Sequence, residues 1–410
     1  MTNKHCRFCN ADLKRTFVDL GRSPLANSLL SAEDIERGEA SYPLHAYVCD
    51  DCLLVQLQEF ERAENIFHDY LYFSSYSQLW LQHCREYAEQ MSKRFALNGR
   101  SLVVEVASND GYLLQYFKER GIGALGVEPA ANVAKAAKDK GIPTEVAFFG
   151  VETAHRLAAA GKSADLIAAN NVLAHVPNLH DFVAGFKLLL KPTGTATFEF
   201  PHLLCLIEER QFDTIYHEHF SYFSFLVADK IFARHGLRIY DVESLPTHGG
   251  SLRLFVCHAD APFARTSGID DLIAKERSAG LDRIDTYAKF AEAVIDIKCE
   301  LLDFLIEARR NGKSVVGYGA PAKGNTLLNY CGVGPELVAY TVDVSPHKQG
   351  RYLPGVQIPI RAPDHIFKTR PHYVLILPWN IKEEIMERMA AIRQWGGRFV
   401  TAIPKLTVLP

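Results

Sequence analysis

Short apolar runs alternate with amphipathic segments through the middle of the chain. The strand-like runs are LVVEVA, ALGVEP, DLIAANNV and TATFEFP, and the helical segments between them include NVAKAAKDKG and LHDFVAGFKLLLKP. Apolar residues at helical spacing in WLQHCREYAEQMSKRFAL predict a further helix just before the first run. This alternation is typical of a parallel sheet covered by crossover helices, so we predict an α/β fold with a doubly wound sheet.

A second, smaller alternation lies toward the C-terminal end. The segments KSVVGYGAPAKGNTLLNYCG, LVAYTVDVSP, YVLILPW, IKEEIMERMAAIRQWGG and RFVTAIP predict another α/β unit. Between the two units, LRIYDVESLPTHGGSLRLFVCH predicts two strands joined by a turn at 248–250. The charged helical stretch 268–311 predicts a connector. The patterns therefore predict domains at residues 1–75, 76–299 and 300–410, in keeping with a length beyond one hydrophobic core.

Composition narrows the classes of function. The chain is 48% hydrophobic and 23% charged with a formal net charge of −3, so it lacks the basic excess of nucleic-acid-binding proteins. No apolar run reaches the roughly 18 residues that a membrane span needs, and MTNKHCRFCN has no apolar signal-peptide core. We expect a cytoplasmic enzyme with neither nucleic acid nor membrane among its partners.

Four cysteines predict a metal site near the N-terminus. Cys6 and Cys9 form one CxxC pair, and Cys49 and Cys52 form a second. Two such turns can supply the four thiolates of a closed structural zinc site, which has no open position for water. We therefore predict structural Zn²⁺ in the first domain. The isolated cysteines are expected to be small buried side chains: Cys84, Cys205, Cys257, Cys299 and Cys331.

The turn after the strand LVVEVA is the predicted cofactor site. It reads EVASNDG and places Ala107 where a nucleotide-binding turn usually has its first glycine, so a dinucleotide fits poorly. Glu128 ends the next strand, where an acid can accept hydrogen bonds from ribose hydroxyls. A ribose clamp without a phosphate cradle indicates S-adenosylmethionine (SAM). The predicted contacts of this turn and clamp are Glu105, Ala107, Asn109, Asp110, Gly111 and Glu128.

Two further pairs of residues complete this predicted pocket. Phe148 and Phe149 follow the third strand position, where an aromatic ring can stack on adenine; packing in the core is the other interpretation. Asn170 and Asn171 end the fourth strand, beside the expected methionyl end.

The segment FDTIYHEHFSYFS carries the acid/base residues. It places Tyr216, His217, Glu218 and His219 together in otherwise apolar, aromatic surroundings. Imidazole, carboxyl and phenol groups are those that transfer protons near neutral pH.

In combination, the motifs resemble those of the SAM-dependent sugar C-methyltransferases over nearly the whole chain. The motifs are the paired CxxC, VVEVASNDGYLL, GVEPAANVA, AANNVLAHVPN, FDTIYHEHFSYFS, LPTHGGSLR and SVVGYGAPAKGNT. The resemblance implies methylation of C3 in a nucleotide-linked 4-keto-6-deoxysugar. It also implies a zinc-binding N-terminal domain, a central methyltransferase domain and a C-terminal Rossmann-like domain that closes over the sugar nucleotide.

The resemblance also implies roles for particular residues. The residues expected to line the substrate pocket are Tyr70, His175, Tyr216, Glu218 and His219. Methylation beside a ketone needs a base for the C–H proton and a donor to the developing enolate oxygen. We assign His219 as the base and Tyr216 and His175 as candidate donors. Glu218 either holds the tautomer of His219 or binds a sugar hydroxyl, and the role of His217 stays open.

The C-terminal unit is expected to contact the substrate nucleotide, which is dTDP, GDP or CDP. Lys323 and Asn325 follow the GYG turn and are predicted to meet the diphosphate at a helix N-terminus. Trp379 and Asn380 are candidates to contact the base, with packing in the core as the other interpretation for Trp379. His248 and Gly249 of LPTHGG complete the predicted substrate contacts. The oligomeric state is left as monomer or homodimer.

Three other classes compete with this hypothesis. An O-methyltransferase needs the same cofactor and also a base. A nicotinamide-dependent sugar oxidoreductase should show a fuller glycine turn than EVASNDG or GYGAPAK provides. A zinc-ribbon protein that binds nucleic acid is disfavoured by the acidic net charge.

Overall fold

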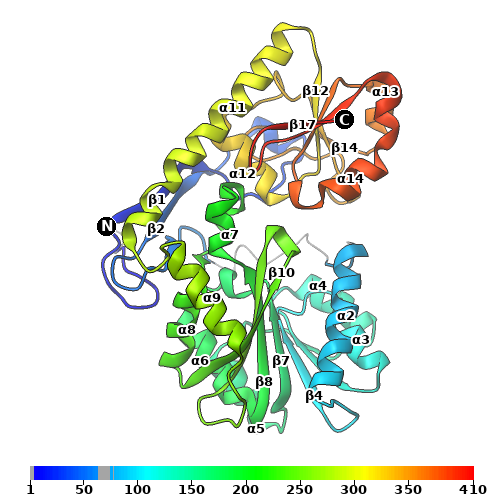
Figure 1. Cartoon of the computed structure of the whole chain (residues 1–410). Helices are drawn as coiled ribbons and strands as arrows, with labels where there is room; N and C mark the ends of the chain where they lie inside the picture. Colours follow the sequence, from blue (N-terminus) through cyan, green and yellow to red (C-terminus); the bar gives the residue numbers. More distant parts are fainter. Residues whose placement is uncertain (1–3, 63–73, 77) are drawn as a thin grey trace.

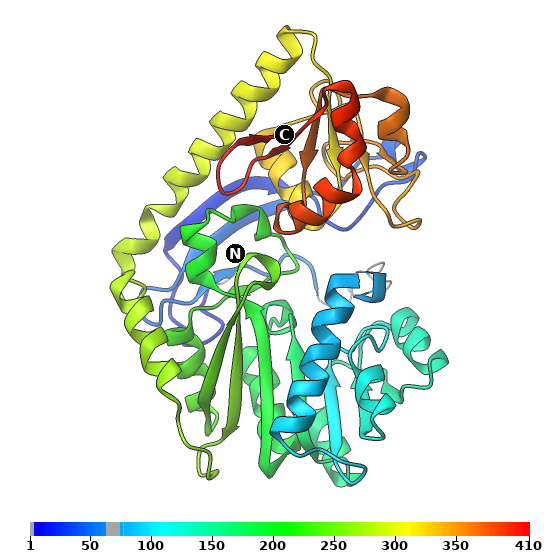
Figure 2. The same cartoon turned by 45° about the vertical axis from the view of Figure 1, so that its right-hand side comes forward.

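The computed structural model describes residues 4–62, 74–76 and 78–410. These residues form three sheets, and the largest stands below the C-terminal sheet in the view of Figure 1. The N-terminal strands lie beside the long helix that runs along one edge of the molecule (Figure 2). None of the helices formed by these residues has the length and apolar character that would let it cross a bilayer.

The central sheet has seven strands in the order β10-β11-β8-β7-β4-β5-β6. Its strands are β4 (Leu102–Val106), β5 (Gly123–Val127), β6 (Thr144–Glu145), β7 (Ala164–Asn170), β8 (Leu190–Pro201), β10 (Leu237–Leu245) and β11 (Ser251–His258). β4 runs parallel to β5 and β7, whereas β11 is antiparallel to both β8 and β10. The strand order reverses at β4, so the ligand crevice of such a sheet lies at the carboxyl ends of β4 and β7.

Helices cover both faces of this sheet (Figure 1). They are α2 (Gln78–Arg94), α3 (Leu114–Glu119), α4 (Ala131–Asp139), α5 (Val151–Ala159), α6 (Leu179–Leu189), α8 (Phe225–Arg234) and α9 (Ser267–Ser278). A further helix, α7 (Leu203–Glu208), packs instead in the core shared by the N-terminal sheet and the C-terminal unit. Successive side chains of a strand point to opposite faces. Val103 accordingly lies in the core with α2 and α3, while Val104 and Val106 lie in the core with α6 and α8. The doubly wound sheet is thus confirmed.

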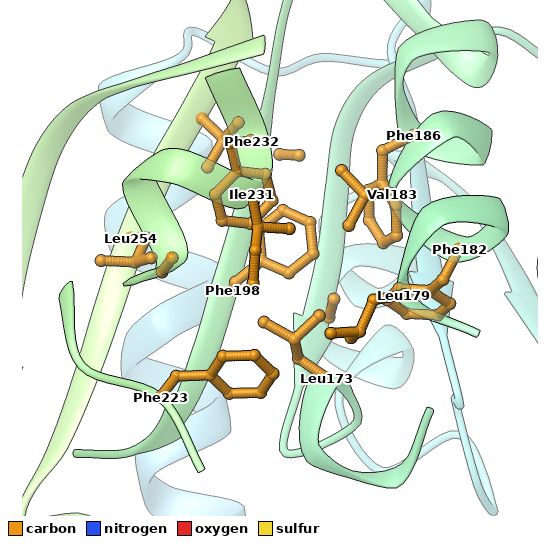
Figure 3. Packing of buried hydrophobic residues seen from close by; sticks show 14 of the residues in the cluster. Leu173, Leu179, Phe182, Val183, Phe186, Phe198, Phe223, Ile231, Phe232 and Leu254 are labelled. Atoms are coloured by element: carbon orange, nitrogen blue, oxygen red, sulfur yellow. The ribbon is translucent and has the colours of Figure 1, made fainter. Parts of the chain in front are cut away.

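The core between the sheet and helices α6 and α8 is aromatic (Figure 3). Phe186 of α6 lies 4.5 Å from Phe198 of β8, and Phe198 lies 4.7 Å from Phe232 of α8, measured between ring centroids. Each such buried ring stabilises the fold by on the order of 2 kcal/mol. This packing fixes the segment 171–178, which joins β7 to α6 at the ligand crevice.

A four-stranded antiparallel sheet lies in the N-terminal part, in the order β1-β2-β3-β9. It contains β1 (Arg15–Ser23), β2 (Tyr42–Val48), β3 (Val55–Leu57) and β9 (Ser221–Tyr222), and η1 (Asp34–Glu36) lies between β1 and β2. β9 comes from the acid/base segment and pairs with β3 through Val55↔Tyr222 and Gln56↔Ser221. The N-terminal sheet therefore holds the residues that directly follow His219.

The C-terminal unit has a six-stranded sheet in the order β14-β13-β12-β15-β16-β17. Its strands are β12 (Val315–Tyr318), β13 (Thr341–Val342), β14 (Ile360–Arg361), β15 (Tyr373–Ile376), β16 (Arg398–Thr401) and β17 (Thr407–Leu409). Its helical elements are α12 (Ala322–Cys331), α13 (His365–Thr369), η6 (Trp379–Ile381), α14 (Lys382–Arg388) and η7 (Ala390–Trp395). β13, β12, β15 and β16 run parallel, which confirms the second α/β unit.

The stretch 268–311, predicted as one connector, forms three helices instead. These are α9, α10 (Ile284–Ala288) and α11 (Phe290–Arg310). Gly280 ends the first segment with a φ of 82°, a left-handed conformation that stops a helix. α9 packs on α8 and β10 of the central sheet, so α11 alone runs on to the C-terminal unit (Figures 1 and 2).

Candidate active site

The turn after β4 has the backbone of a glycine-rich loop. Ala107, Asn109 and Gly111 have left-handed φ values of 58°, 48° and 76°. Such a conformation costs roughly 1–2 kcal/mol for a residue other than glycine, so the surrounding structure must hold Ala107 in place. At Gly111 a Cβ atom would lie 3.0 Å from Ile142 Cγ1, so a side chain would also crowd the neighbouring core.

A cavity of about 310 Å³ opens beside this turn, at the carboxyl ends of the central strands. Seven predicted cofactor residues line it: Ala107, Asn109, Glu128, Phe148, Phe149, Asn170 and Asn171. Phe148 remains 44% exposed, which leaves its ring free to cover a ligand. Phe149 instead packs on Phe182 and Phe186, with centroid distances of 5.7 and 4.9 Å, so the core interpretation applies in part to this residue.

Glu128 joins two sides of the cavity. Its Oε2 accepts the backbone N–H of Asn109 at 2.9 Å, and its Oε1 accepts that of Ala130 at 2.8 Å. Burial raises the pKa of Glu128, while these two hydrogen bonds lower it. Each carboxylate oxygen keeps a further lone pair, so the residue can accept from ribose hydroxyls as well.

Three predicted cofactor contacts do not line the cavity, namely Glu105, Asp110 and Gly111. Asp110 is buried; its Oδ2 accepts from the Ser75 hydroxyl and lies 3.0 Å from Lys140 Nζ. Glu105 is fully buried, and burial raises the pKa of its carboxyl well above the usual range. These residues support the turn from behind, so the sequence pattern located the loop but not which of its side chains face the ligand.

Replacing Glu128 by glutamine should weaken binding of S-adenosylhomocysteine (SAH) by roughly 10- to 100-fold, the usual worth of a hydrogen bond to a charged group. Isothermal titration with SAH measures the change. Glu145→Gln is a matched control, because Glu145 ends the neighbouring strand β6, pairs with Arg156 and does not line the cavity. Equal SAH affinity in the Glu128 variant and the wild type would contradict the ribose clamp.

The acid/base residues adjoin the same cavity. His175, in η3 (Leu173–His175), lines the cavity, and its ring meets that of His219 edge-on at a centroid distance of 4.7 Å. The Tyr216 ring lies 4.0 Å from the His219 ring. These three side chains are partly exposed, whereas Glu218 is buried, with only 3% of its surface exposed. The structure therefore brings His175, Tyr216 and His219 together at the edge of the cavity.

His219 is held as a neutral imidazole with a defined tautomer. Its Nδ1 lies 2.9 Å from the carbonyl oxygen of Thr214, which can only accept, so Nδ1 carries the proton and Nε2 carries the lone pair. Burial, helped by the charge of His175, lowers the pKa of His219 well below the usual range. Burial also lowers the pKa of His175 to about 4. Both rings are thus uncharged at neutral pH.

Glu218 does not hold the tautomer of His219, contrary to one of its two predicted roles. Its Oε1 accepts from Asn27 Nδ2 at 2.7 Å, and the Thr214 carbonyl performs the orienting role instead. Burial raises the pKa of Glu218 to about 7. His217 points to the N-terminal sheet, where its Nε2 lies 3.3 Å from the Pro43 carbonyl, and so it packs between segments.

The raised pKa of Glu218 predicts a pH-dependent stability. Folding raises this pKa from 4.5 to about 7, so its contribution to stability is fully present below pH 4.5 and is lost as the pH rises through 7. Glu218→Gln should therefore stabilise the protein by up to about 3 kcal/mol at pH 8 and change it little at pH 4.5. Urea unfolding at both pH values measures this, with the exposed Glu209→Gln as control. An equal difference at both pH values would exclude ionisation as the cause.

The C-terminal unit brings Lys323, Trp379 and Asn380 next to the acid/base segment, where Trp379 Nε1 donates to Asp213 Oδ2 at 2.7 Å. Lys323 Nζ donates to Asn380 Oδ1 at 2.8 Å and lies 4.6 Å from the Trp379 ring centroid. Gly249 is needed at its position, because a Cβ there would lie 2.4 Å from Trp379 Cη2. Its neighbour His248 meets the Trp80 ring edge-on at 5.3 Å.

Two further sites complete the comparison with the sequence. Asn325 is fully buried in the first turn of α12, so it is a packing residue as well as a predicted contact. Tyr70 lies outside the described residues. Sequence reasoning missed Asp213, Thr214 and Asn27; the first two belong to the FDTIYHEH segment, whereas nothing near Asn27 marks it.

The four predicted zinc ligands converge. The sulfur atoms of Cys6, Cys9, Cys49 and Cys52 all lie within 4.8 Å of one another, with Cys6–Cys52 at 3.5 Å and Cys9–Cys49 at 3.3 Å. Thiolates bound tetrahedrally to zinc lie about 3.8 Å apart, so the set fits the metal. Gln56 Nε2 donates to Cys6 Sγ at 3.1 Å. Of the isolated cysteines, Cys299 is exposed and Cys205 half-buried, so the prediction of burial is wrong for Cys299.

Arg7 connects the first cysteine pair to the active site. Its Nη1 donates to the carbonyl of Pro177, a cavity residue, at 2.9 Å. Its Nη2 donates to the carbonyl of Leu57 at 2.5 Å, and its guanidinium lies 5.3 Å from the Phe220 ring centroid. Arg7, which lies between Cys6 and Cys9, thus contacts both Pro177 of the cofactor cavity and Phe220, the residue after His219.

The strand order, the left-handed turn and the cavity define a class I SAM-dependent methyltransferase. Three family models match: "Putative zinc binding domain" at residues 6–67, "Methyltransferase domain" at 79–242 and "C-methyltransferase C-terminal domain" at 246–404. C-methyltransferase NovU from Streptomyces niveus is 36% identical over 404 residues, covering 98% of this chain and 96% of its own. The chain belongs to this family of C-methyltransferases.

Solved methyltransferases resemble only part of the chain. One from Clostridium acetobutylicum is 10% identical and covers 43% of this chain and 92% of its own, with a TM-score of 0.36. The magnesium protoporphyrin IX methyltransferase ChlM from Synechocystis PCC 6803, solved with SAH, is 14% identical and covers 48% and 91%, with a TM-score of 0.35. At these TM-scores the likeness carries no weight beside the strand order.

The family membership confirms the predicted enzyme class and both cofactors. The protein is a SAM-dependent C-methyltransferase, and its four-cysteine cluster fits the zinc of its zinc-binding domain. The O-methyltransferase, nicotinamide-dependent and nucleic-acid-binding alternatives lose their support.

Proposed function

We propose that the enzyme methylates C3 of a nucleotide-linked 4-keto-6-deoxysugar. The main support for the proposal is the arrangement of His219. This neutral imidazole donates its Nδ1–H to the Thr214 carbonyl, and its ring contacts that of His175, which lines the cofactor cavity. Such a base suits a carbon acid, and a carbon next to a ketone is acidic enough once its enolate is stabilised. A sugar with a ketone at C4 provides that carbon at C3.

Proton removal is the first step of the proposed reaction. His219 Nε2 takes the proton from C3, the C–H electron pair forms the C3–C4 double bond, and the carbonyl electrons move to the oxygen. A hydrogen bond between His175 and the backbone of Glu218 opposes the lowering of the His175 pKa by burial, so this ring is engaged with the main chain. Tyr216 therefore replaces His175 as the preferred donor to the enolate oxygen from the acid/base segment.

Methyl transfer is the second step. SAM bound at the cavity would supply an electrophilic methyl group. The C3 carbon of the enolate would form a bond to this methyl group as the methyl–sulfur bond breaks with its electron pair left on sulfur, so that the ketone re-forms and SAH is released. Asn170 and Asn171 line the cavity together with His175, so the methionyl end of the cofactor is proposed to lie next to the base. Holding the two reacting carbons in line supplies much of the rate, because a bimolecular step becomes an oriented one.

The remaining substrate contacts are proposed to come from the acid/base segment and from the C-terminal unit. Glu218, with a pKa of about 7, can bind a sugar hydroxyl as acceptor or donor. The nucleotide, which is dTDP, GDP or CDP, is proposed to lie along the C-terminal unit near Trp379 and Asn380. Cytoplasmic location and a monomer or homodimer remain parts of the proposal.

A substrate panel tests this function. The enzyme is incubated with SAM and the dTDP-, GDP- or CDP-linked 4-keto-6-deoxyhexose, and release of SAH is measured. Each ketone is paired with its 4-hydroxy counterpart, which cannot form the enolate. We expect SAH release with at least one ketone and with none of the 4-hydroxy sugars. Equal turnover of a 4-hydroxy sugar would contradict the proposal.

A further inference from the structure

Three segments from distant parts of the chain meet the start of the acid/base segment or one another beside it. α12 contacts η4 (Phe212–Thr214), and η5 (Thr247–Gly249) contacts η6. Trp379 Nε1 donates to Asp213 Oδ2 at 2.7 Å, and its ring carries Lys323 on one face. Asp213 directly precedes Thr214, the residue that orients His219. Lys323 is thereby fixed to the turn that holds the base.

The surroundings of Lys323 leave its ammonium available. An ammonium has three N–H donors, and within the described part of the chain Nζ donates to Asn380 Oδ1. Lys323 keeps accessible surface, whereas Asp213 has none and Trp379 is 9% exposed. The buried residues Asp213 and Trp379 therefore hold the accessible ammonium of Lys323 in place, as positioning residues do for a catalytic group.

The positive charge of Lys323 affects the pKa of the base, His219. Burial is the main cause that lowers the pKa of His219 and of His248, and the Lys323 charge lowers both further. Burial raises the pKa of Asp213 to about 6, and Lys323 opposes that rise. Lys323 is thus placed beside the base segment by its contact with Trp379, which bonds Asp213, so its charge can act on charge that develops there.

The sequence alone predicts that Lys323 binds the substrate diphosphate, but this geometry favours another task. The carboxylate of Asp213, near Lys323, would repel a diphosphate, which carries a concentrated negative charge, more than an enolate, whose single charge is spread over two atoms. The enolate oxygen forms next to the carbon that His219 deprotonates, whereas the diphosphate lies across the sugar ring.

We propose that Lys323 is a further catalytic residue, whose ammonium stabilises the enolate oxygen formed by His219, and that Asp213 positions it through Trp379. The inference rests on the proposed function. When the C3 proton moves to His219, the negative charge on the C4 oxygen lies between Lys323 and the Tyr216 hydroxyl. The ammonium keeps its protons. The C3–C4 electron pair then forms the bond from C3 to the methyl group, the oxygen electrons restore the C4 ketone, and the methyl–sulfur pair stays on sulfur as SAH leaves uncharged.

Solvent exchange tests this role separately from methyl transfer. The enzyme is mixed with SAH and the accepted ketosugar nucleotide in D₂O, and loss of the C3 proton signal is followed by NMR. We expect Lys323→Met to slow this exchange by at least about 100-fold, the usual effect of removing one oxyanion donor. The KM for the sugar nucleotide and the affinity for the free nucleoside diphosphate should stay within about three-fold of wild type, because the diphosphate is bound elsewhere.

Two further variants keep the test decisive. Lys323→Arg retains the charge and should recover at least about a tenth of the exchange rate, even if the Met variant fails to fold. Lys313→Met, an exposed lysine of the same unit, should behave as wild type. Wild-type exchange together with a ten-fold or larger loss of diphosphate affinity would overturn the inference in favour of the diphosphate. Absence of exchange in the wild-type enzyme with every ketosugar would overturn the proposed function itself, and this inference with it.

Discussion

Replacing His219 by alanine should lower kcat by about 10³-fold or more while leaving SAH affinity within about three-fold of wild type. The large effect follows because the Nε2 lone pair of this ring is the proton acceptor, and water cannot take its place in a buried site oriented by Thr214. The small effect on SAH follows because His175, and not His219, lines the cofactor cavity. Single-turnover kinetics and isothermal titration measure the two quantities.

The control for this prediction is His155→Ala, an exposed histidine on α5 of the same unit. It should retain wild-type turnover. A His219→Ala enzyme that kept more than a tenth of the wild-type kcat would refute the assignment of the base. An equal loss of SAH affinity and turnover would instead indicate that the ring supports the cavity.

Replacing Cys49 by serine should reduce the zinc content from near one per chain to near zero and unfold the N-terminal sheet. Structural zinc contributes about 10–16 kcal/mol of binding free energy to small domains, far more than a sheet with β3 of three residues can replace. Elemental analysis and thermal unfolding measure both effects. Cys299→Ser is the matched control, because Cys299 is an exposed thiol far from the cluster in sequence.

Loss of zinc should also reach the active site. Arg7 joins the first cysteine pair to Pro177 of the cofactor cavity, and β3 holds β9 directly after His219. We therefore expect the metal-free protein to lose turnover and SAH affinity together, and zinc to restore both on refolding. A metal-free variant with normal SAH affinity would show that the N-terminal sheet and the cavity are energetically independent.

The sequence predicted the elements that rest on local signals. The alternation around EVASNDG predicted the parallel sheet, Glu128 followed from its place at a strand end, and the CxxC spacing predicted the thiolate cluster. Each of these signals lies within a few residues of the feature that it marks. The period of the hydrophobic pattern and the spacing of the motif residues were therefore sufficient to predict these features.

Features that depend on distant partners could not be predicted in this way. β9 contains two residues and exists because Val55 and Tyr222, far apart in sequence, pair across strands. The bond from Asn27 to Glu218 spans 191 residues, and the Thr214 carbonyl orients His219, so holding this tautomer, one of the two roles considered for Glu218, was wrong. Likewise, the sequence could not show that Asp110 and Glu105 face away from the cavity, because side-chain direction in an irregular turn is set by packing.

The most direct test of the account is the position of the new methyl group in the product. The enzyme is supplied with SAM carrying a ¹³C-labelled methyl group and with the accepted 4-keto sugar nucleotide, and long-range carbon–proton correlations are recorded by NMR. We expect a methyl group bonded to carbon, with correlations to C2, C3 and the C4 ketone. A methyl group on oxygen, or one correlated with C4, C5 and C6, would contradict the assignment of C3 as the carbon that His219 deprotonates.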